Sequence, residues 1–394
     1  MDSTGKLPPI LIVGAHTMGL ALLRAFKDMD IERIFISFDQ DDMGRVSRYA
    51  TKVIDSPDPE SCADEFLELL IKLAKTYPGA VLFPASDTSL KAISMKKEVL
   101  SEYYIVACPE WAIVELIIDK KRTYEIAEKT GVPYPKTLLP CSEEEIEQYL
   151  QGLDFPCLVK PTQSHLYFRR FRRKMVLAND PDELMKAYRQ AVACGLEVVF
   201  QEFIPGDDSN GVNYNSYAID GKVRVEFTAR KIRSAPPGLG SPCVARSAEI
   251  SEIYELGRKI VAGLGFYGYS CTEFKMDQRT GIYKLMEVNG RHNLSGLLAV
   301  YCGLNFPEMH YKHLVLGEIP SQPRYKEGKY WIDLSRDFAY HFPWIIKGKN
   351  SISQYLLPYR ADHIYAIYDT KDIGPFFKRT GTLVRHFFNH KVTL

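Results

Sequence analysis

The sequence predicts an α/β protein in which an N-terminal, Rossmann-like parallel-sheet domain precedes a larger region that is richer in strands. Three observations support this prediction. Short apolar runs alternate with helical patterns over the first 110 residues, which is typical of βαβ units. Longer strand patterns joined by turn-forming residues follow after residue 197. The length of 394 residues allows roughly two to three domains.

The first domain is expected to span residues 1–110. Its apolar runs read as buried parallel strands, because helices cover both faces of such a sheet. Functional groups then gather at the carboxyl ends of the strands, which is where Asp39 and Asp87 stand. The expected strands are 10–13, 33–38, 80–84 and 103–107, and the expected helices include 16–26 and 63–75.

A second region, 111–196, begins with a helical pattern over 111–129. Two prolines in the segment 131–135 end that helix, because proline fixes an extended geometry. A second helix is expected over 142–150, with Ser142 as its N-cap and Glu145 as the partner in a capping box. A strand over 157–160 and a helix over 182–193 complete this region.

The third region, 197–320, is expected to form the large lobe of the protein. Asp220-Gly221 and the segment 279–281 are turn signals, so the strands on either side of each should pair as hairpins. The last segment, 321–394, is expected to be an extension packed on this lobe, and its sequence indicates no role. The expected strands are 198–203, 214–219, 223–231, 269–276 and 283–288.

Composition excludes several classes of function. The net charge is +1, whereas nucleic-acid binding proteins usually carry a basic excess, so no nucleic-acid partner is expected. No apolar run approaches the roughly 18–20 residues that cross a bilayer, so no membrane partner is expected. No cleavage pattern of a secretory signal follows the first apolar run, and the cysteines are scattered. A cytoplasmic protein is therefore expected, and a homodimer is compatible with the sequence.

The most informative stretch is the hairpin predicted over 269–291. One strand carries Glu273, and the next carries Glu287 with Asn289 two residues further on the same face. Three oxygen ligands on one surface suit Mg²⁺, whose remaining positions nucleotide phosphates can fill. Arg291 would point to the same side and could neutralise a phosphoryl group. The alternative is a set of polar residues on a solvated face.

Three further segments carry candidate binding groups. Lys160 ends an apolar strand and is followed by a basic stretch, 162–174, which reads as a mobile flap or as an exposed charged hairpin. The strand 198–203 leads into the acidic turn Asp207-Asp208, which could contact an adenine edge and a ribose. Lys120 belongs to an earlier basic pair that opens a helix.

In this order the four segments resemble the ATP-grasp superfamily, and the resemblance covers about residues 10–317. The segment 287–295, E-V-N-G-R-H-N-L-S, is similar to the carboxylate–amine ligase branch, and most to relatives of D-aspartate ligase. The resemblance implies an N-terminal Rossmann-like domain followed by a two-lobed ATP-grasp fold. Residues 111–196 would form the small lobe with its phosphate flap, and residues 197–320 the lobe that holds metal and substrate.

The resemblance also implies roles for individual residues. Those expected to bind ATP are Lys120 and Lys160 at the phosphates, Gln201, Glu202 and Ile204 at the adenine, and Asp208 at the ribose. Those expected to bind one or two Mg²⁺ ions, with Mn²⁺ as a substitute, are Glu273, Glu287 and Asn289. Those expected to act on the phosphoryl group or on a substrate carboxylate are Arg291, Arg230 and Lys231.

Two features qualify the resemblance. The flap contains no glycine, whereas many relatives have a flap rich in small residues, so its phosphate contacts are not assigned. Its cations suggest the hypothesis of an acidic substrate. These cations are Arg169, Arg170, Arg172, Arg173 and Lys174.

The expected function is an ATP- and Mg²⁺-dependent ligase that activates a carboxylate as an acyl phosphate and joins it to an amine of an amino acid or peptide. Its partners would be these small molecules. A carboxylase-like or purine-pathway enzyme and a non-catalytic ATP-binding scaffold are the alternatives. An NAD-dependent dehydrogenase is disfavoured, because the turn from Gly14 to Gly19 has the spacing G-x-x-x-x-G, and His16 stands where a close glycine would be needed.

Overall fold

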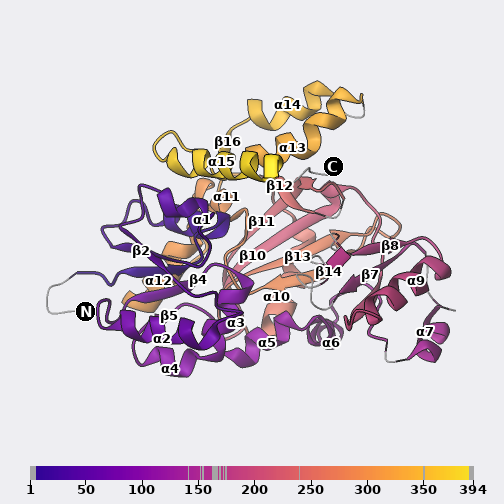
Figure 1. Cartoon of the computed structure of the whole chain (residues 1–394), viewed down its shortest axis with the longest axis horizontal. Coiled ribbons are helices and arrows are strands. Elements are labelled where there is room, and N and C mark those ends of the chain that lie inside the picture. The colour runs from indigo at the N-terminus through magenta and orange to yellow at the C-terminus, as the bar shows by residue number, and fades with distance from the viewer. Residues whose placement is uncertain are drawn as a thin grey trace.

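Three β-sheets organise the chain (Figure 1), as a computed structural model shows. The structure describes residues 6–140, 142–150, 152, 155–161, 167, 170–171, 173, 175–238, 240–348 and 351–389. Within these ranges the expected α/β class is confirmed, with a parallel N-terminal sheet followed by two sheets that are mainly antiparallel.

No helix in the described ranges combines the length and apolar character required to span a membrane.

The N-terminal sheet has five parallel strands in the order β3-β2-β1-β4-β5. The strands β1 and β4 are buried along their whole length, as expected for a sheet covered by helices on both faces. The elements are β1 (Ile10–Val13), α1 (Thr17–Ala25), β2 (Arg33–Ser37), η1 (Met43–Val46), β3 (Lys52–Asp55), α2 (Ala63–Ala74), β4 (Val81–Pro84), α3 (Asp87–Met95), α4 (Lys97–Ser101) and β5 (Ile105–Val106).

The small lobe contains a four-stranded antiparallel sheet in the order β6-β9-β7-β8, at the right of Figure 1. Because β9 pairs with both β6 and β7, the expected boundary between residues 196 and 197 falls inside this sheet. The elements are β6 (Thr137–Leu138), α7 (Glu143–Leu150), β7 (Cys157–Pro161), β8 (Val176–Ala178), α9 (Pro181–Val192) and β9 (Val198–Glu202).

The large lobe is built on a seven-stranded sheet in the order β14-β13-β10-β11-β12-β15-β16. Both expected hairpin turns are present, and Asp220 and Gly221 each have a positive φ, as a two-residue hairpin turn requires. The elements are η2 (Asp208–Asn210), β10 (Gly211–Ile219), β11 (Lys222–Ala235), β12 (Ser241–Ser247), η3 (Ser251–Ile253), α10 (Tyr254–Gly263), β13 (Gly268–Met276), β14 (Tyr283–Asn289), α11 (Gly296–Tyr301) and α12 (Phe306–Leu316).

The C-terminal segment extends this same sheet. Its two short strands pair with each other and join the edge at β12. Its three helices lie together at the top of Figure 1, above the N-terminal domain and the large lobe. The elements are β15 (Tyr330–Ile332), α13 (Leu334–Ile346), α14 (Ile352–Arg360), β16 (His363–Tyr365) and α15 (Gly374–Asn389).

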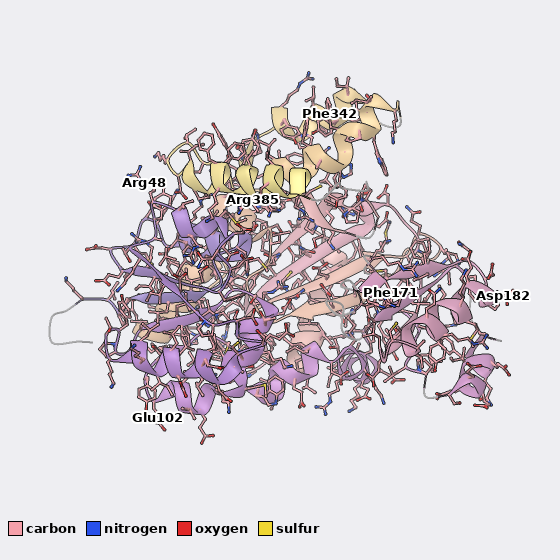
Figure 2. All side chains as sticks on the ribbon, viewed as in Figure 1. Arg48, Glu102, Phe171, Asp182, Phe342 and Arg385 are labelled. Carbon is pink, nitrogen blue, oxygen red and sulfur yellow. The ribbon has the colours of Figure 1, made fainter. Side chains whose placement is uncertain are left out.

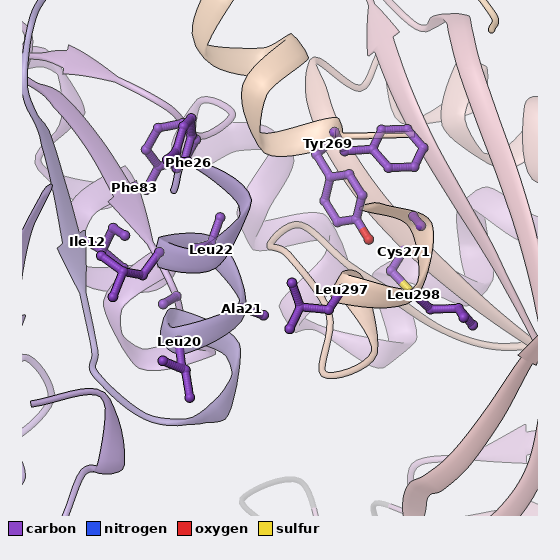
Figure 3. Packing of buried hydrophobic residues seen from close by; sticks show 14 of the residues in the cluster. Ile12, Leu20, Ala21, Leu22, Phe26, Phe83, Tyr269, Cys271, Leu297 and Leu298 are labelled. Carbon is purple, nitrogen blue, oxygen red and sulfur yellow. The ribbon is translucent and has the colours of Figure 1, made fainter. Parts of the chain in front are cut away.

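One hydrophobic core joins the N-terminal domain to the large lobe. Figure 3 shows Leu22 of α1 and Phe26, the residue after this helix, on one side of this core, and Leu297 and Tyr269 of the large lobe on the other. All four side chains are buried. Burial of a large apolar side chain contributes roughly 1.5–3 kcal/mol, so this shared core fixes the N-terminal domain against the large lobe.

The single helix expected over 111–129 is in fact two helices, α5 (Trp111–Ile118) and α6 (Lys120–Thr130). Asp119 between them has an extended backbone, and its carboxylate accepts hydrogen bonds from the amides of Lys121 and Arg122. Asp119 is therefore the N-cap of the second helix. Gly131 ends that helix in the left-handed conformation, as the breaker at 131–135 predicted.

Six strands of the sheets were not expected from the sequence: β3, β6, β8, β12, β15 and β16. The strand β3 lies at the edge of the N-terminal sheet, and its residues are exposed or half-buried, so it lacks an apolar run. The strand β12 begins near Pro242, and a proline near a strand end obscures the pattern.

A buried ion pair ties the C-terminal segment to the N-terminal domain. Nη2 of Arg24 lies 3.0 Å from Oδ2 of Asp372, and the two side chains are 5% and 1% exposed. Ser47 donates its hydroxyl to the same carboxylate at 2.7 Å. Arg24 also donates to backbone carbonyls of the C-terminal segment, including that of Ile367 at 2.8 Å.

We expect Asp372→Ala to lower the free energy of unfolding by about 3–5 kcal/mol, because it leaves the Arg24 guanidinium buried without its counter-charge. Chemical denaturation would measure the loss. Asp362→Ala is the matched control, since Asp362 pairs with Lys329 at the surface and its removal should change stability little. Equal losses in the two variants would contradict the structural role of the buried pair.

Candidate active site

A cavity of about 310 Å³ lies between the small lobe and the seven-stranded sheet. One part of its wall is apolar and could hold a flat aromatic group, and another part carries four lysines and four carboxylates. The apolar wall includes Leu158, Met175, Phe203, Ile204, Phe274 and Met286. The charged residues are Lys120, Lys160, Lys231, Lys275, Asp207, Asp208, Glu273 and Glu287.

Two of the predicted phosphate ligands meet in this cavity although they come from different elements. Lys120 opens α6, and Lys160 lies near the end of β7. Nζ of Lys160 donates to Oε1 of Gln201 at 2.5 Å. Burial and then the positive charge of Lys120 lower the pKa of Lys160 to about 7, although Glu287 opposes the shift. An anion bound in the cavity would therefore raise the pKa of Lys160 and favour its protonated form.

The hinge between the lobes contributes two residues to the cavity. Ile204 and Asp208 line it, and Asp208 accepts hydrogen bonds from the amides of Ser234 and Gly238 at 2.8 and 2.9 Å. The side chains of Gln201 and Glu202 are both buried and occupied elsewhere.

Gln201 holds Lys160 and also donates to Tyr124 and Thr137, at 2.8 and 3.0 Å. Glu202 accepts from Lys284 at 2.8 Å and from Arg279 at 2.5 Å. Both side chains are therefore engaged within the protein and do not line the cavity, and the contact of this hinge with adenine stays a prediction.

The hairpin of β13 and β14 brings Glu273 and Glu287 directly opposite each other. Like charges at paired positions repel, so the pair needs cations near it. Nζ of Lys231, from β11, lies 2.5 Å from Oε2 of Glu273. Burial would raise the pKa of Glu287, but Lys120, Lys231 and other cationic or donor groups outweigh burial and hold the pKa below its ordinary value.

This donor set fits a divalent cation. Asn289 follows Glu287 on the same strand, and its Nδ2 lies 3.3 Å from Oε1 of Glu287, so the three predicted ligands are adjacent. Two ionised carboxylates and an amide oxygen are the hard ligands that Mg²⁺ binds beside phosphate oxygens. Lys231 would share Glu273 with the ion, because a carboxylate offers several lone pairs.

A second cavity, of about 350 Å³, borders the same carboxylates from the other side. Glu273 and Glu287 line both cavities, and so does Ser241. Arg291 lines the second cavity, and its guanidinium is fixed by Asp87 of the N-terminal domain at 3.0 Å and by Oδ1 of Asn289 at 3.0 Å. A group bound here would meet a group from the first cavity at the two carboxylates.

The structure separates Arg230 from this arrangement. Neighbouring residues of a strand point to opposite faces, so Arg230 and Lys231 cannot share one site. Arg230 donates to the carbonyl of Ser209 at 2.7 Å and lies 3.4 Å from the hydroxyl of Tyr283, on the opposite face of the sheet. The expectation that Arg230 contacts phosphate or substrate is therefore corrected, whereas Lys231 lines the first cavity.

Most of the predicted flap lies outside the described residues, including Arg169, Arg172, Lys174 and residues 162–166. Its two described cations contact residues in α9 or just after it, and neither lines a cavity. Arg173 lies 3.4 Å from Oε1 of Gln190, and Arg170 interacts with Cys194. For these two arginines, the hypothesis of binding an acidic substrate gains no support.

The glycine-rich turn after β1 serves packing. A Cβ on Gly19 would lie 1.9 Å from the carbonyl oxygen of Gly14, so only glycine lets α1 approach the turn. His16 caps α1 by accepting from the amide of Met18. Burial and then Arg291 lower the pKa of His16 to about 4, so the imidazole is neutral near pH 7.

Two groups of cavity-lining residues were not predicted from the sequence. Lys275 lines the first cavity, and its position two residues after Glu273 on one strand could have indicated the shared face. Arg336 and Arg379 of the C-terminal segment line the second cavity. Nothing local in the sequence signals those two, because tertiary packing alone brings them to the site.

Comparison with known proteins agrees with this geometry. No model of a protein family matches the sequence. The chain is 29% identical to the D-aspartate ligase of Enterococcus faecium over 256 residues, which covers 61% of each protein. It is 24% identical to a D-alanine–D-alanine ligase of Pseudomonas putida over 213 residues, covering 49% of this chain and 62% of that protein. These matches span about three-fifths of the relatives' own length.

Solved structures show the same fold. The L-amino acid ligase of Bacillus licheniformis superposes with a TM-score of 0.62 at 17% identity, covering 79% of this chain and 75% of that one. An ATP-analogue complex of biotin carboxylase from Campylobacter jejuni superposes with a TM-score of 0.64 at 17% identity, covering 81% and 74%. The chain therefore shares the fold of these solved structures, and in sequence it is similar to D-aspartate and D-alanine–D-alanine ligases.

We expect Glu287→Gln to fold normally and to lose at least about 100-fold in turnover, because it removes a charge from the metal-binding pair without changing volume. Release of phosphate from ATP at saturating Mg²⁺ would measure the loss. Glu226→Gln is the control, since Glu226 is a partly buried carboxylate of the same sheet that pairs with Arg258 outside both cavities. Near-normal turnover of the Glu287 variant would contradict the assignment.

We also expect nucleotide binding to take up a proton. Lys160 has a pKa of about 7 without ligand, and polyphosphate would raise that pKa, so affinity should fall by up to about tenfold per pH unit above pH 7 and level off below it. Calorimetric titration with ATP and Mg²⁺ at pH 8, in buffers of different ionisation enthalpy, would count the protons. Lys160→Met should abolish this uptake, and unchanged uptake in that variant would contradict the assignment.

Proposed function

We propose that the protein is an ATP- and Mg²⁺-dependent ligase that joins a carboxylate to an amine, with an amino acid or a peptide among its substrates. The observation that carries this proposal is the common wall of the two cavities, formed by Glu273 and Glu287. A nucleotide in one cavity and a carboxylate in the other would meet there. The similarity to D-aspartate and D-alanine–D-alanine ligases supports the same chemistry.

The first step would transfer the γ-phosphoryl group of ATP to the substrate. A carboxylate oxygen attacks the γ-phosphorus, the bond to the β-phosphate oxygen breaks, and ADP leaves with the electron pair. A metal ion held by Glu273, Glu287 and Asn289 would supply charge neutralisation at the phosphates. Lys120 and Lys160 would hold the phosphates on the small-lobe side of the cavity.

The second step would form the new bond. The amine nitrogen attacks the carbonyl carbon of the acyl phosphate, phosphate leaves with the oxygen it received, and the amine loses a proton. Negative charge develops on the carbonyl oxygen, and Arg291 is the group of the second cavity placed to meet it, because Asp87 and Asn289 fix its guanidinium. No side-chain nucleophile is required.

The test is phosphate release from ATP and Mg²⁺ over a panel of amino acids, offered singly and in pairs, with detection of product mass. We expect release that depends on one carboxylate and one amine, and a product whose mass is their sum less one water. D-Aspartate belongs in the first panel because a relative carries that name.

Two outcomes would contradict the proposal. Release that needs bicarbonate and an amine would indicate the carboxylase-like alternative. A rise in melting temperature with ATP, without release for any pair or for a peptide acceptor, would favour the non-catalytic scaffold.

A further inference from the structure

We infer that the second cavity takes a substrate with two anionic groups, and that Arg379 of the C-terminal segment recognises the group that does not react. This inference rests on the proposed function, since it concerns the carboxylate substrate of that reaction. It gives a role to the segment after residue 320, for which the sequence indicates none.

Four parts of the chain converge on this cavity. The N-terminus of α1 contributes Thr17 and Met18, the sheet contributes Asn213 with the two carboxylates, and the turn after β14 contributes Arg291. The C-terminal segment contributes Asp333, Arg336 and Arg379. The cavity volume of about 350 Å³ lies at the lower end of the range for small-molecule sites, which suits a compound of amino-acid size.

The three arginines of the cavity differ in what they already bind. Arg291 gives its Nε and Nη2 to Asp87. Arg336 donates to the carbonyls of Ala235, Ser241 and Pro242, so it holds the loop between β11 and β12 in place. Arg379 forms no hydrogen bond or ion pair with the described part of the chain, and its Nε is buried without a partner.

Arg379 as a whole is half-buried, but its Nε is buried, and a buried donor without an acceptor loses its interactions with water. Two of the three acidic residues of the cavity are already engaged, and the third, Glu287, belongs to the predicted metal-binding pair. Asp333 caps α13 and accepts from Ser335 and from the amide of Arg336, and Glu273 pairs with Lys231. A carboxylate of the ligand is therefore the acceptor that Arg379 lacks, and arginine binds carboxylates in a two-pronged geometry.

The cavity also offers a partner for a neutral or cationic polar group. Asn213 is 3% exposed, and its Oδ1 has no hydrogen-bond partner in the described part of the chain. It pairs with Glu273 across β10 and β13, so it stands beside the predicted metal ligands. A carboxylate acceptor for Arg379, an ammonium donor for Asn213 and a reacting carboxylate near Glu273 together describe an acidic amino acid.

The experiment compares aspartate and glutamate, as both enantiomers, with asparagine and glutamine as the carboxylate substrate. The amide analogues keep the shape and lose the second charge. We expect the wild-type protein to prefer a dicarboxylic amino acid by about tenfold or more in kcat/KM. Arg379→Gln should erase that preference by raising KM, with kcat for the amide analogue little changed, and Arg379→Lys should restore part of it.

Arg385→Gln is the matched control. Arg385, labelled in Figure 2, lies on the same helix. Its side chain is 57% exposed, and it pairs with Asp41 of the N-terminal domain outside the cavity. This variant should keep the preference. Calorimetric titration of each amino acid onto protein loaded with Mg²⁺ and a non-hydrolysable ATP analogue provides a readout apart from turnover, and there only the Arg379 variants should bind the dicarboxylic amino acid more weakly.

The outcomes separate the inference from the function on which it rests. If the wild-type protein ligates amino acids but prefers neutral ones, or if Arg379→Gln keeps the wild-type preference, then the role of Arg379 is wrong and the ligase proposal stands. If no amino acid supports phosphate release or binds to the loaded protein, both are overturned. Loss of preference in the Arg385 control as well would show that α15 acts through packing, which also overturns the specific role.

Discussion

The candidate active site is organised around the repulsion between two carboxylates that the fold places face to face. Glu273 and Glu287 occupy paired positions on adjacent antiparallel strands, where side chains are about 5 Å apart. The backbones of β13 and of the edge strand β14 are paired along these positions, so the sheet holds the two residues opposite each other. The surrounding structure therefore has to supply positive charge from elsewhere, and each cation comes from a different part of the chain. Lys231 comes from β11, Lys120 from the helix before the small lobe, and Arg291 from the turn after β14.

This requirement also explains how the parts of the protein are joined. Arg291 reaches the carboxylates while its guanidinium is held by Asp87 at the start of α3, so the N-terminal domain fixes a charge of the large lobe. The common core between α1 and the large lobe holds the two in register (Figure 3). Lys160 is placed by Gln201 on the neighbouring strand, so the small-lobe sheet orients a cation that lines the first cavity. Precise placement of charges, rather than a reactive side chain, is what phosphoryl transfer demands of a protein.

The sequence predicted those features of the fold and the candidate site that depend on a local residue pattern. Glu287 and Asn289 share a face because a strand alternates, and Asp220-Gly221 turns a hairpin because both residues tolerate a positive φ. The same alternation rule separates Arg230 from Lys231, so this error was avoidable. The side-chain contacts of Gln201 could not be predicted from strand alternation. Its side chain turns toward Lys160 and Tyr124, and these contacts depend on strand pairing and on a helix distant in sequence.

The strands and helices of the C-terminal segment could not be predicted from local sequence patterns. Its strands β15 and β16 have three residues each, and its helices α13 and α14 contain Pro343 and Pro358, which obscure a helical pattern. The segment holds its place through contacts distant in sequence, above all the buried pair of Asp372 with Arg24. That pair fixes the stretch just before α15, the helix that carries Arg379 to the wall of the second cavity. The carboxylates that would bind metal lie in the seven-stranded sheet, whereas the unpaired arginine lies on a helix of the C-terminal segment that packs against η1 of the N-terminal domain. Substrate preference could therefore change through this helix while the arrangement that activates the carboxylate stays the same.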